Sequence, residues 1–261
     1  MTQFGNYADI HVDIHDYVAT VEIRRPPNNF FDVSLIDQIA SAYEALDNEN
    51  SCRAIVLCAQ GKNFCAGNNF GSAATDVTAV ASGKNPLYEM GVRLFRTKKP
   101  SVGAIQGAAI GGGLGLAMST DFRVASPDAR MSANFVLLGF HHGFGLTMTL
   151  PRLIGQQQAN LMLYTGRRYT GEEALKLGLC EYLVPLEELR QRAWDLAREI
   201  ATAAPLAVES VRTTMRKGMA EGYAAATDRE SAEQSRLRAT EDFKEGVKAV
   251  ADRRAGNFVN R

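Results

Sequence analysis

The chain begins with short stretches in which apolar and polar residues alternate, and these give way to longer periodic runs. Alternation over residues 9–14 and 17–23 predicts two strands joined by a polar turn. Residues 33–46 carry large apolar side chains at helical spacing, and the apolar run 54–59 predicts a buried strand. This order of strand, helix and strand predicts an α/β fold.

The same rhythm continues through the middle of the chain. A helix is expected near 87–96, and strands are expected at 102–105 and 122–125. Residues 72–85 are rich in alanine, serine, threonine and glycine, which suits a mobile cover.

Beyond Pro151 the periodicity becomes helical, interrupted by glycine and proline. Helices are expected near 186–202, 207–218 and 228–254. Nothing requires a second independent domain, so we expect a core over 1–203 and a helical region over 204–261.

Composition excludes several kinds of partner. The 261 residues include 29 basic and 29 acidic ones, so the net charge offers no attraction for nucleic acid or an anionic membrane. The N-terminal sequence has no basic or apolar targeting pattern, and no apolar run reaches a membrane-spanning length, which predicts a cytoplasmic protein. Four cysteines without CxxC spacing are expected to be reduced thiols.

Two glycine-containing loops are the strongest candidates for chemistry. Gly111, Gly112 and Gly113 follow an apolar strand and open an apolar helix, a turn in which backbone N–H groups converge on an anion. The spacing fits neither a dinucleotide fingerprint nor a phosphate-binding P-loop, and a simple packing turn stays open. A second loop, residues 61–70, also follows a strand, so two loops can supply two N–H donors.

Further motifs stand at compatible spacings along nearly the whole chain: Phe64-Cys65-Ala66-Gly67, Ala104-Ile105-Gln106-Gly107, Leu138-Gly139, Leu150-Pro151-Arg152 and Leu163-Tyr164-Thr165-Gly166-Arg167. With them the sequence closely resembles the crotonase superfamily, also called the enoyl-CoA hydratase/isomerase family. The resemblance implies a crotonase-like spiral of repeated ββα units whose helical C-terminal region mediates trimerisation. It further implies a homotrimer or dimer of trimers, an acyl-CoA thioester substrate, and neither a metal nor a cofactor beyond the substrate's own coenzyme A.

The resemblance also assigns roles to individual residues. The backbone N–H groups of Asn68 and Gly112 would hold the thioester oxygen, with the small residues Gly67 and Gly111 beside them. The carbonyl of Ala66 would recognise adenine. Either Arg24 or Arg25 would meet a CoA phosphate, although a solvated strand end explains both arginines equally well.

The acid–base residues of the well-known hydratases are missing. The resemblance places their two glutamates at Gly115 and Phe135, and neither side chain can transfer a proton. Two-glutamate hydration is therefore not expected, and Phe135 either lines an apolar acyl pocket or packs in the core.

Another group is then needed for proton transfer. His141 and His142 lie close to the acyl pocket by resemblance, although either could be a hydrogen-bonded scaffold residue. Glu89 stands between the two loops, although a solvated helical glutamate is the simpler interpretation. Cys65 is expected to pack as a small hydrophobe.

Three functions remain open after this reasoning. The favoured one is an enolate-stabilising acyl-CoA lyase or isomerase, nominally an enoyl-CoA hydratase, that does not use the two-glutamate mechanism. The second is an acyl-CoA decarboxylase or C–C hydrolase, in which the departing group makes fewer demands on protein carboxylates. The third is a CoA-binding protein without catalysis.

Overall fold

The structure is a computed structural model that describes residues 2–69 and 85–261. The cover expected over 72–85 lies outside the described residues except for Asn85, whose side chain caps helix α2 (Pro86–Arg96) by accepting from Leu87 N. Within the described ranges, no helix has both the length and the apolarity to cross a membrane.

The larger sheet of the described chain has seven strands, and the strands expected from the sequence lie at its centre. β2 (Ile10–His15) pairs antiparallel with β3 (Val18–Ile23), and β3 then begins a parallel series. The spatial order is β1 (Thr2–Gln3), β2, β3, β4 (Ala54–Ala59), β5 (Ser101–Ile105), β7 (Phe122–Ala125) and β10 (Tyr182–Leu183).

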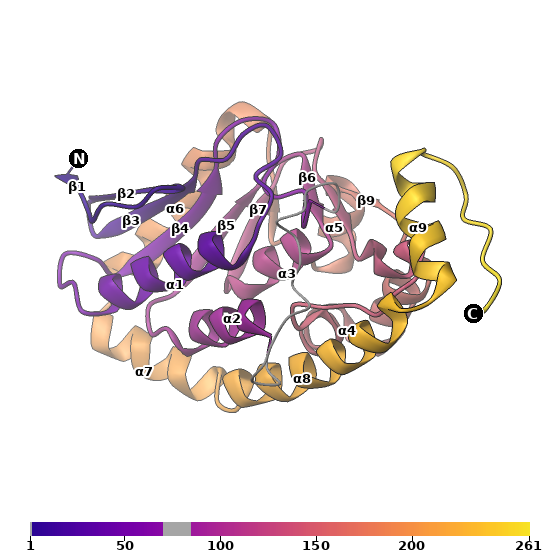
Figure 1. Cartoon of the computed structure of the whole chain (residues 1–261). Coiled ribbons are helices and arrows are strands. Elements are labelled where there is room, and N and C mark those ends of the chain that lie inside the picture. Colours follow the sequence, from indigo (N-terminus) through magenta and orange to yellow (C-terminus); the bar gives the residue numbers. More distant parts are fainter. Residues whose placement is uncertain (1, 70–84) are drawn as a thin grey trace.

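A second, smaller sheet carries the turn that leads to the triple glycine. β6 (Ala108–Ile110) pairs parallel with β8 (Arg130–Ser132), which pairs antiparallel with β9 (Tyr169–Thr170). Strands of the two sheets alternate with helices along the chain, so the expected α/β architecture is confirmed (Figure 1).

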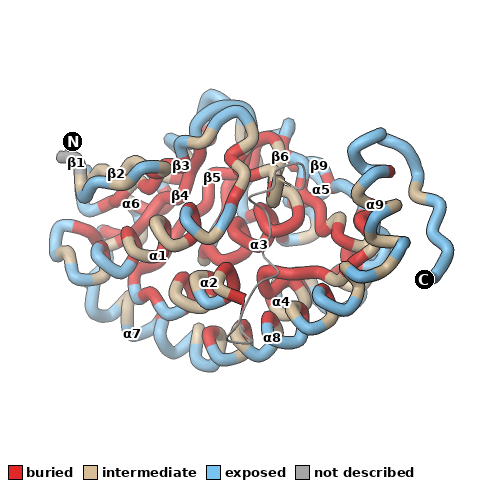
Figure 2. Tube along the Cα trace, in the orientation of Figure 1, coloured by how far each residue is buried: buried red, intermediate tan, exposed pale blue. Residues whose placement is uncertain are grey.

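Successive residues of a strand point to opposite faces of its sheet. In the large sheet both of these faces are buried under helices. Ile55 and Leu57 of β4 belong to the core cluster that α1 (Val33–Asp47) covers. Val56 lies on the other face, in a cluster with α6 (Leu189–Thr202). Figure 2 shows the buried chain running through the middle of the molecule, with exposed segments around it.

The remaining helical elements surround this core. They are α3 (Gly112–Ser119), η2 (Asn134–Leu138), α4 (Leu146–Thr165), α5 (Gly171–Leu177), η3 (Leu186–Glu188), α7 (Pro205–Met215), α8 (Met219–Arg238) and α9 (Glu241–Ala251). In Figure 1, α7 and α8 run along the lower edge of the molecule and α9 lies at the end opposite the N-terminus.

One expectation for the C-terminal region is wrong. The single helix expected near 228–254 is two helices, because α8 begins earlier and ends at Arg238. The Thr240 side chain accepts from Phe243 N at 3.1 Å, and Glu241 and Asp242 occupy the first turn of α9. A hydroxyl cap followed by acidic residues stabilises a new helix start at this point.

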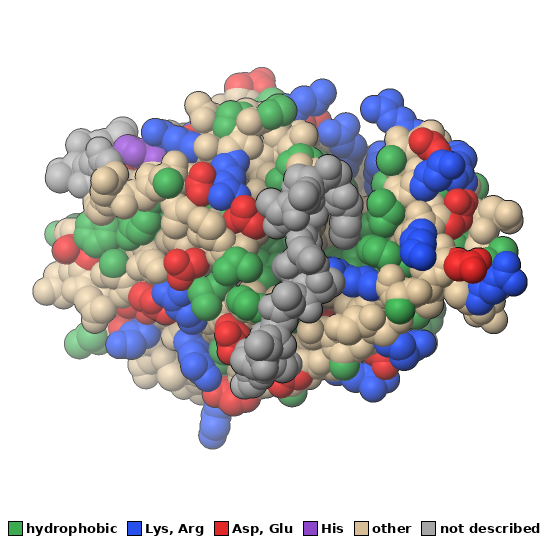
Figure 3. Space-filling model, viewed as in Figure 1, with side chains coloured by type: hydrophobic (Ala, Val, Ile, Leu, Met, Phe, Trp, Pro, Cys, Tyr) green, Lys and Arg blue, Asp and Glu red, His purple; other side chains and the backbone are tan. Residues whose placement is uncertain are grey.

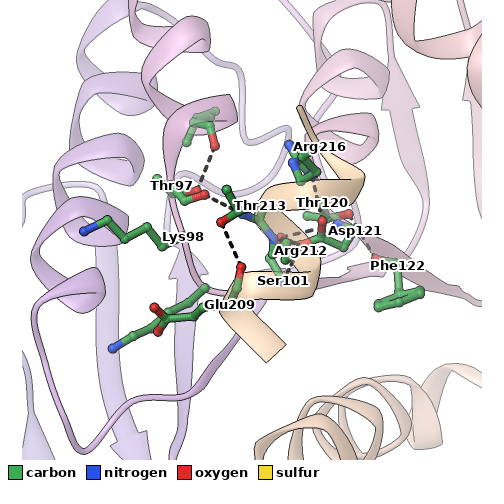
Figure 4. Close-up of polar contacts among 12 residues, drawn as sticks. Thr97, Lys98, Ser101, Thr120, Asp121, Phe122, Glu209, Arg212, Thr213 and Arg216 are labelled. Carbon is green, nitrogen blue, oxygen red and sulfur yellow. Dashed lines mark hydrogen bonds and ion pairs between the residues drawn. The ribbon is translucent and has the colours of Figure 1, made fainter. Parts of the chain in front are cut away.

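An ion-pair cluster fastens α7 to the sheet. Asp121, just before β7, binds Arg212 Nε at 2.9 Å and Arg216 Nη1 at 2.7 Å (Figure 4). Burial opposes the charge of Asp121, but the two arginine charges prevail and hold its pKa below the usual range. The first helix beyond residue 204 is thus joined to the core by buried charges.

Candidate active site

The two glycine-containing loops meet at the entrance to α3. Cys65 N donates to Ala108 O at 2.8 Å, and Ile110 N donates back to Cys65 O at 3.1 Å. A Cβ atom on Gly113 would lie 2.1 Å from Cys65 O, and one on Gly67 would lie 2.6 Å from Ile110 O. Only residues without a side chain permit this close approach of the two backbones.

Two backbone N–H groups are available where the loops meet. Gly112 is the first residue of α3, where an N–H has no partner within the helix. Among the described residues we find no acceptor for the N–H of Gly112 or of Asn68. The two loops border the same space, since a Cβ on Gly67 would lie 3.9 Å from Gly112 N. Such a pair of donors at a helix start can stabilise an oxyanion.

A pocket opens beside these loops, and its described lining is aromatic, amide-bearing and basic. The aromatic residues are Phe31, Tyr88, Phe135, Phe140 and Phe144, and the basic ones are Arg130, Arg167, Arg168, Arg238, Arg253 and Arg254. The described lining contains no carboxylate, histidine, lysine or cysteine. Figure 3 shows basic side chains over the end of the molecule formed by α9.

Comparison with known proteins settles the family. The model of the enoyl-CoA hydratase/isomerase family matches residues 13–261. The chain belongs to this family. The resemblance to the crotonase superfamily inferred from the motifs is thereby confirmed.

Individual relatives of this enoyl-CoA hydratase/isomerase family member match nearly end to end. The chain is 30% identical to a crotonyl-CoA hydratase of Syntrophomonas wolfei, covering 98% of this chain and 99% of that protein. It is 32% identical to a short-chain-enoyl-CoA hydratase of Clostridium acetobutylicum, covering 94% and 95%. The crystal structure of an enoyl-CoA hydratase/isomerase from Pseudoalteromonas atlantica T6c superposes with a TM-score of 0.85 at 28% identity, covering 97% of this chain and 100% of that one.

Half of the expected site residues of this family member surround the pocket. Those in its lining are Ala66, Gly67, Asn68, Gly111, Gly112 and Phe135. Those absent from the described lining are Gly115, His141, His142, Glu89, Arg24 and Arg25.

At the first expected glutamate position there is no room for a side chain. A Cβ on Gly115 would lie 2.9 Å from both Cβ and Cδ1 of Phe144, and 3.0 Å from the Phe144 carbonyl oxygen. The Phe144 side chain is 1% exposed, so it has little freedom to move away. The space that a carboxylate would enter is therefore filled by an aromatic residue.

The second position is also aromatic. Phe135 lies on η2, and its ring is 3.6 Å from the place of a Cβ on Gly111. The ring packs against Phe140 with centroids 5.3 Å apart and against His142 at 5.4 Å. Phe135 thus serves both interpretations offered by the sequence, since it lines the pocket and packs in the core.

The two histidines are absent from the described pocket lining. His142 Nε2 lies 2.8 Å from Leu163 O, and because a carbonyl only accepts, this nitrogen carries the proton. Burial lowers the pKa of His142 to about 4, so the ring is neutral at pH 7 and a weak base. The neighbouring His141 Nδ1 donates to the backbone oxygen of His142 at 2.9 Å. This geometry favours the scaffold interpretation of both residues.

The other charged candidates are solvated or already paired. Glu89 is exposed in the first turn of α2. Arg25 binds Asp9 at 2.7 Å and Asp32 at 2.8 Å, and Arg24 binds a neighbouring carboxylate at 2.6 Å. A role for either arginine in CoA binding stays a prediction.

Gln234 and Glu230 of α8 hold the turn before α4 through hydrogen bonds, a clamp that the sequence did not predict. Gln234 Oε1 accepts from the Tyr88 hydroxyl at 2.8 Å, and Gln234 Nε2 donates to His141 O at 3.0 Å. The buried Glu230 accepts from Gly145 N at 2.8 Å and from Thr147 N at 3.1 Å. The only signal in the sequence is the i, i+4 spacing of a glutamate and a glutamine on a helix, which is common on solvated faces.

Proposed function

We propose that the protein is an acyl-CoA enzyme that stabilises a thioester enolate between the N–H groups of Asn68 and Gly112, without two-glutamate hydration. The observation that carries the proposal is the pair of available donors at the junction of the two loops. The names of the relatives, crotonyl-CoA hydratase and short-chain-enoyl-CoA hydratase, support an unsaturated acyl thioester as substrate.

The geometry can lower the energy of an enolate in two ways. Both donors would shorten their hydrogen bonds as negative charge develops on the thioester oxygen, and the start of α3 contributes its dipole. The described lining supplies no carboxylate to move a proton at carbon. Among the described residues, proton transfer is then left to water, to the substrate, or to the candidates His141, His142 and Glu89.

A backbone donor can be tested with one pair of variants. Asn68→Pro removes the N–H, whereas Asn68→Ala keeps it and changes the same side chain. We expect the proline variant to lose about 10²- to 10³-fold in kcat relative to the alanine variant. The measurement is turnover of crotonyl-CoA and related enoyl thioesters by mass spectrometry, with CoA affinity as the check on folding. Equal rates for the two variants would remove the donor from the mechanism.

A second candidate, decarboxylation, is favoured by the absence of a carboxylate from the described lining. In an α-carboxyacyl (malonyl-type) thioester the bond from the α-carbon to the carboxylate breaks, CO₂ leaves, and the electron pair of that bond forms the enolate that the two donors hold. The α-carbon then takes a proton from water, so no protein base is needed. Release of CO₂ from a malonyl-type thioester, without turnover of enoyl thioesters, would select this reaction. C–C hydrolysis of a β-diketone thioester belongs in the same panel.

A CoA-binding protein without catalysis is the third possibility. CoA affinity by calorimetry, with no conversion of any thioester in the panel, would establish it. The Ala66 carbonyl for adenine and Arg24 or Arg25 for phosphate would then be tested by the affinity of truncated CoA fragments.

We also propose that the chain assembles as a homotrimer or a dimer of trimers. Large apolar side chains on the outer face of α7 support this, since Leu206 is 80% exposed, Val211 63% and Met215 74%. Light scattering of the purified protein gives the mass directly.

A further inference from the structure

Phe144 holds an unusual backbone conformation at the pocket wall. Its φ is 56°, in the left-handed region that bulky residues rarely adopt, and its side chain is 1% exposed. Such strain persists only where the surroundings fix the residue, and it commonly marks a functional position. The conformation aims a buried aromatic ring at the place left free by Gly115.

The surroundings of Phe144 supply the restraint. Glycine flanks it on both sides, and a Cβ on Gly143 would lie 2.3 Å from the Tyr88 hydroxyl and 2.5 Å from Gln234 Nε2. Glu230 binds the N–H of Gly145 at 2.8 Å, immediately after Phe144. Close packing by Tyr88 of α2 and hydrogen bonding by Glu230 of α8 thus fix the turn, and the ring of Phe144 is held in one place.

The held ring belongs to one of two groups of aromatic rings in the described pocket lining. Phe144 meets Phe31 edge to face with centroids 5.4 Å apart, and it meets Tyr88 edge to face at 6.5 Å. In the second group, Phe135 packs against Phe140 with ring centroids 5.3 Å apart. All five residues line the pocket, so aromatic rings occupy both places where the family resemblance expects glutamate side chains.

We infer that Phe144 and Phe135 are specificity-determining residues that select an aryl acyl group, and this inference rests on the proposed acyl-CoA function. Aromatic rings prefer edge-to-face and offset contacts with other rings, which an alkyl chain cannot make. A flat acyl group also has fewer rotatable bonds to immobilise than an alkyl chain with the same number of carbons. Fixed rings exploit both differences because they need no rearrangement on binding.

A matched pair of thioesters isolates this selection. Cinnamoyl-CoA and trans-2-nonenoyl-CoA have the same number of acyl carbons and the same conjugated thioester, and they differ in the ring. We expect the wild-type protein to bind cinnamoyl-CoA at least about tenfold more tightly by calorimetry, the ratio that one or two ring contacts give. CoA alone is measured beside them.

Variants assign the preference to residues. Phe144→Leu and Phe135→Leu are each expected to reduce the tenfold preference to about twofold or less while keeping the affinity for CoA. Phe95→Leu is the control, because Phe95 is also buried but stacks on Tyr223 and is absent from the described lining. If Phe144→Leu does not fold, Phe135→Leu decides alone.

The outcomes separate the inference from the proposed function. Equal affinity of the wild type for the two thioesters, or a preference that survives in both leucine variants, overturns the aryl selection and leaves the acyl-CoA function standing. Failure to bind CoA and both thioesters overturns the proposed function, and the inference that rests on it.

Discussion

Replacing Gly115 with alanine tests whether Phe144 really closes the first expected glutamate position. In a solvated helix this change stabilises by about 1 kcal/mol, because alanine is the better helix former. Gly115 lies inside α3 and is buried. Its new Cβ would approach three atoms of Phe144 at 2.9 to 3.0 Å, well inside normal van der Waals contact.

The expected result follows from the balance of two effects. Inserting a methyl group into a packed core costs about 1–3 kcal/mol, and the gain in helix propensity offsets about 1 of these. One contact is a backbone oxygen, which cannot rotate away, so we expect Gly115→Ala to lower the free energy of unfolding by about 1–2 kcal/mol. The measurement is urea unfolding followed by circular dichroism at pH 7.

Gly222→Ala is the matched control for helix propensity. Gly222 lies inside α8, where a Cβ would meet only the flexible end of Met148, at 3.3 Å. We expect this variant to gain about 0.5–1 kcal/mol. The two substitutions are identical, so opposite signs would come from their surroundings.

A double-mutant cycle assigns the cost of Gly115→Ala to Phe144. Phe144→Ala alone should cost about 3–5 kcal/mol, because it empties a buried site. In the double variant the new methyl group has room, so the combined cost should fall short of the sum by at least about 1 kcal/mol. A coupling energy near zero, or a Gly115→Ala variant as stabilised as the control, would refute the contact.

Three further predictions follow from the buried titratable groups. Asp121→Asn leaves two buried arginines unpaired and should cost about 3–5 kcal/mol in urea unfolding. The pKa of Asp121 is lowered in the folded state, so the wild type loses this stability as the pH falls through that pKa; an asparagine variant with the same acid slope would contradict this. His142 has a folded pKa of about 4 against 6.5 ordinarily, so only the unfolded chain takes up the proton between these values. Stability should therefore fall by about 3 kcal/mol as the pH drops through that window, and His142→Gln, which can still donate to the same carbonyl, should show no such loss in pH-resolved unfolding. Burial raises the pKa of the Cys65 thiol to about 12, so a chromogenic disulfide should label it in denaturant and not in the native protein; rapid native labelling would count against its burial.

Much of the fold could be predicted because local pattern decides it. The strands β2, β3, β4, β5 and β7 all lie within a residue or two of the positions expected from apolar runs. Each of these runs has enough β-branched and apolar residues to specify one burial pattern. The break at Thr240 was missed because the helical periodicity continues across it, although the hydroxyl followed by two acidic residues is a start signal.

The candidate site could also be predicted only in part. The loops around Gly67 and Gly112 could be predicted because their chemistry belongs to the backbone, and glycine is the one residue that allows their approach. The contacts that hold Phe144 could not be predicted, since Tyr88 and Gln234 are 146 residues apart and belong to no motif. Contacts of this separation arise from tertiary packing alone.

The sequence and the structure explain the glycine at position 115 in different ways. By resemblance it marks a missing carboxylate, which on its own predicts an empty corner beside the reacting carbons. The structure fills that corner with Phe144, held at a strained φ of 56° by a clamp from α8. A decayed site has no need of such a restraint, because relaxing the turn would relieve the strain. The filled corner fits the aryl acyl group proposed above, and the Gly115 and Phe144 cycle measures how tightly Phe144 packs there.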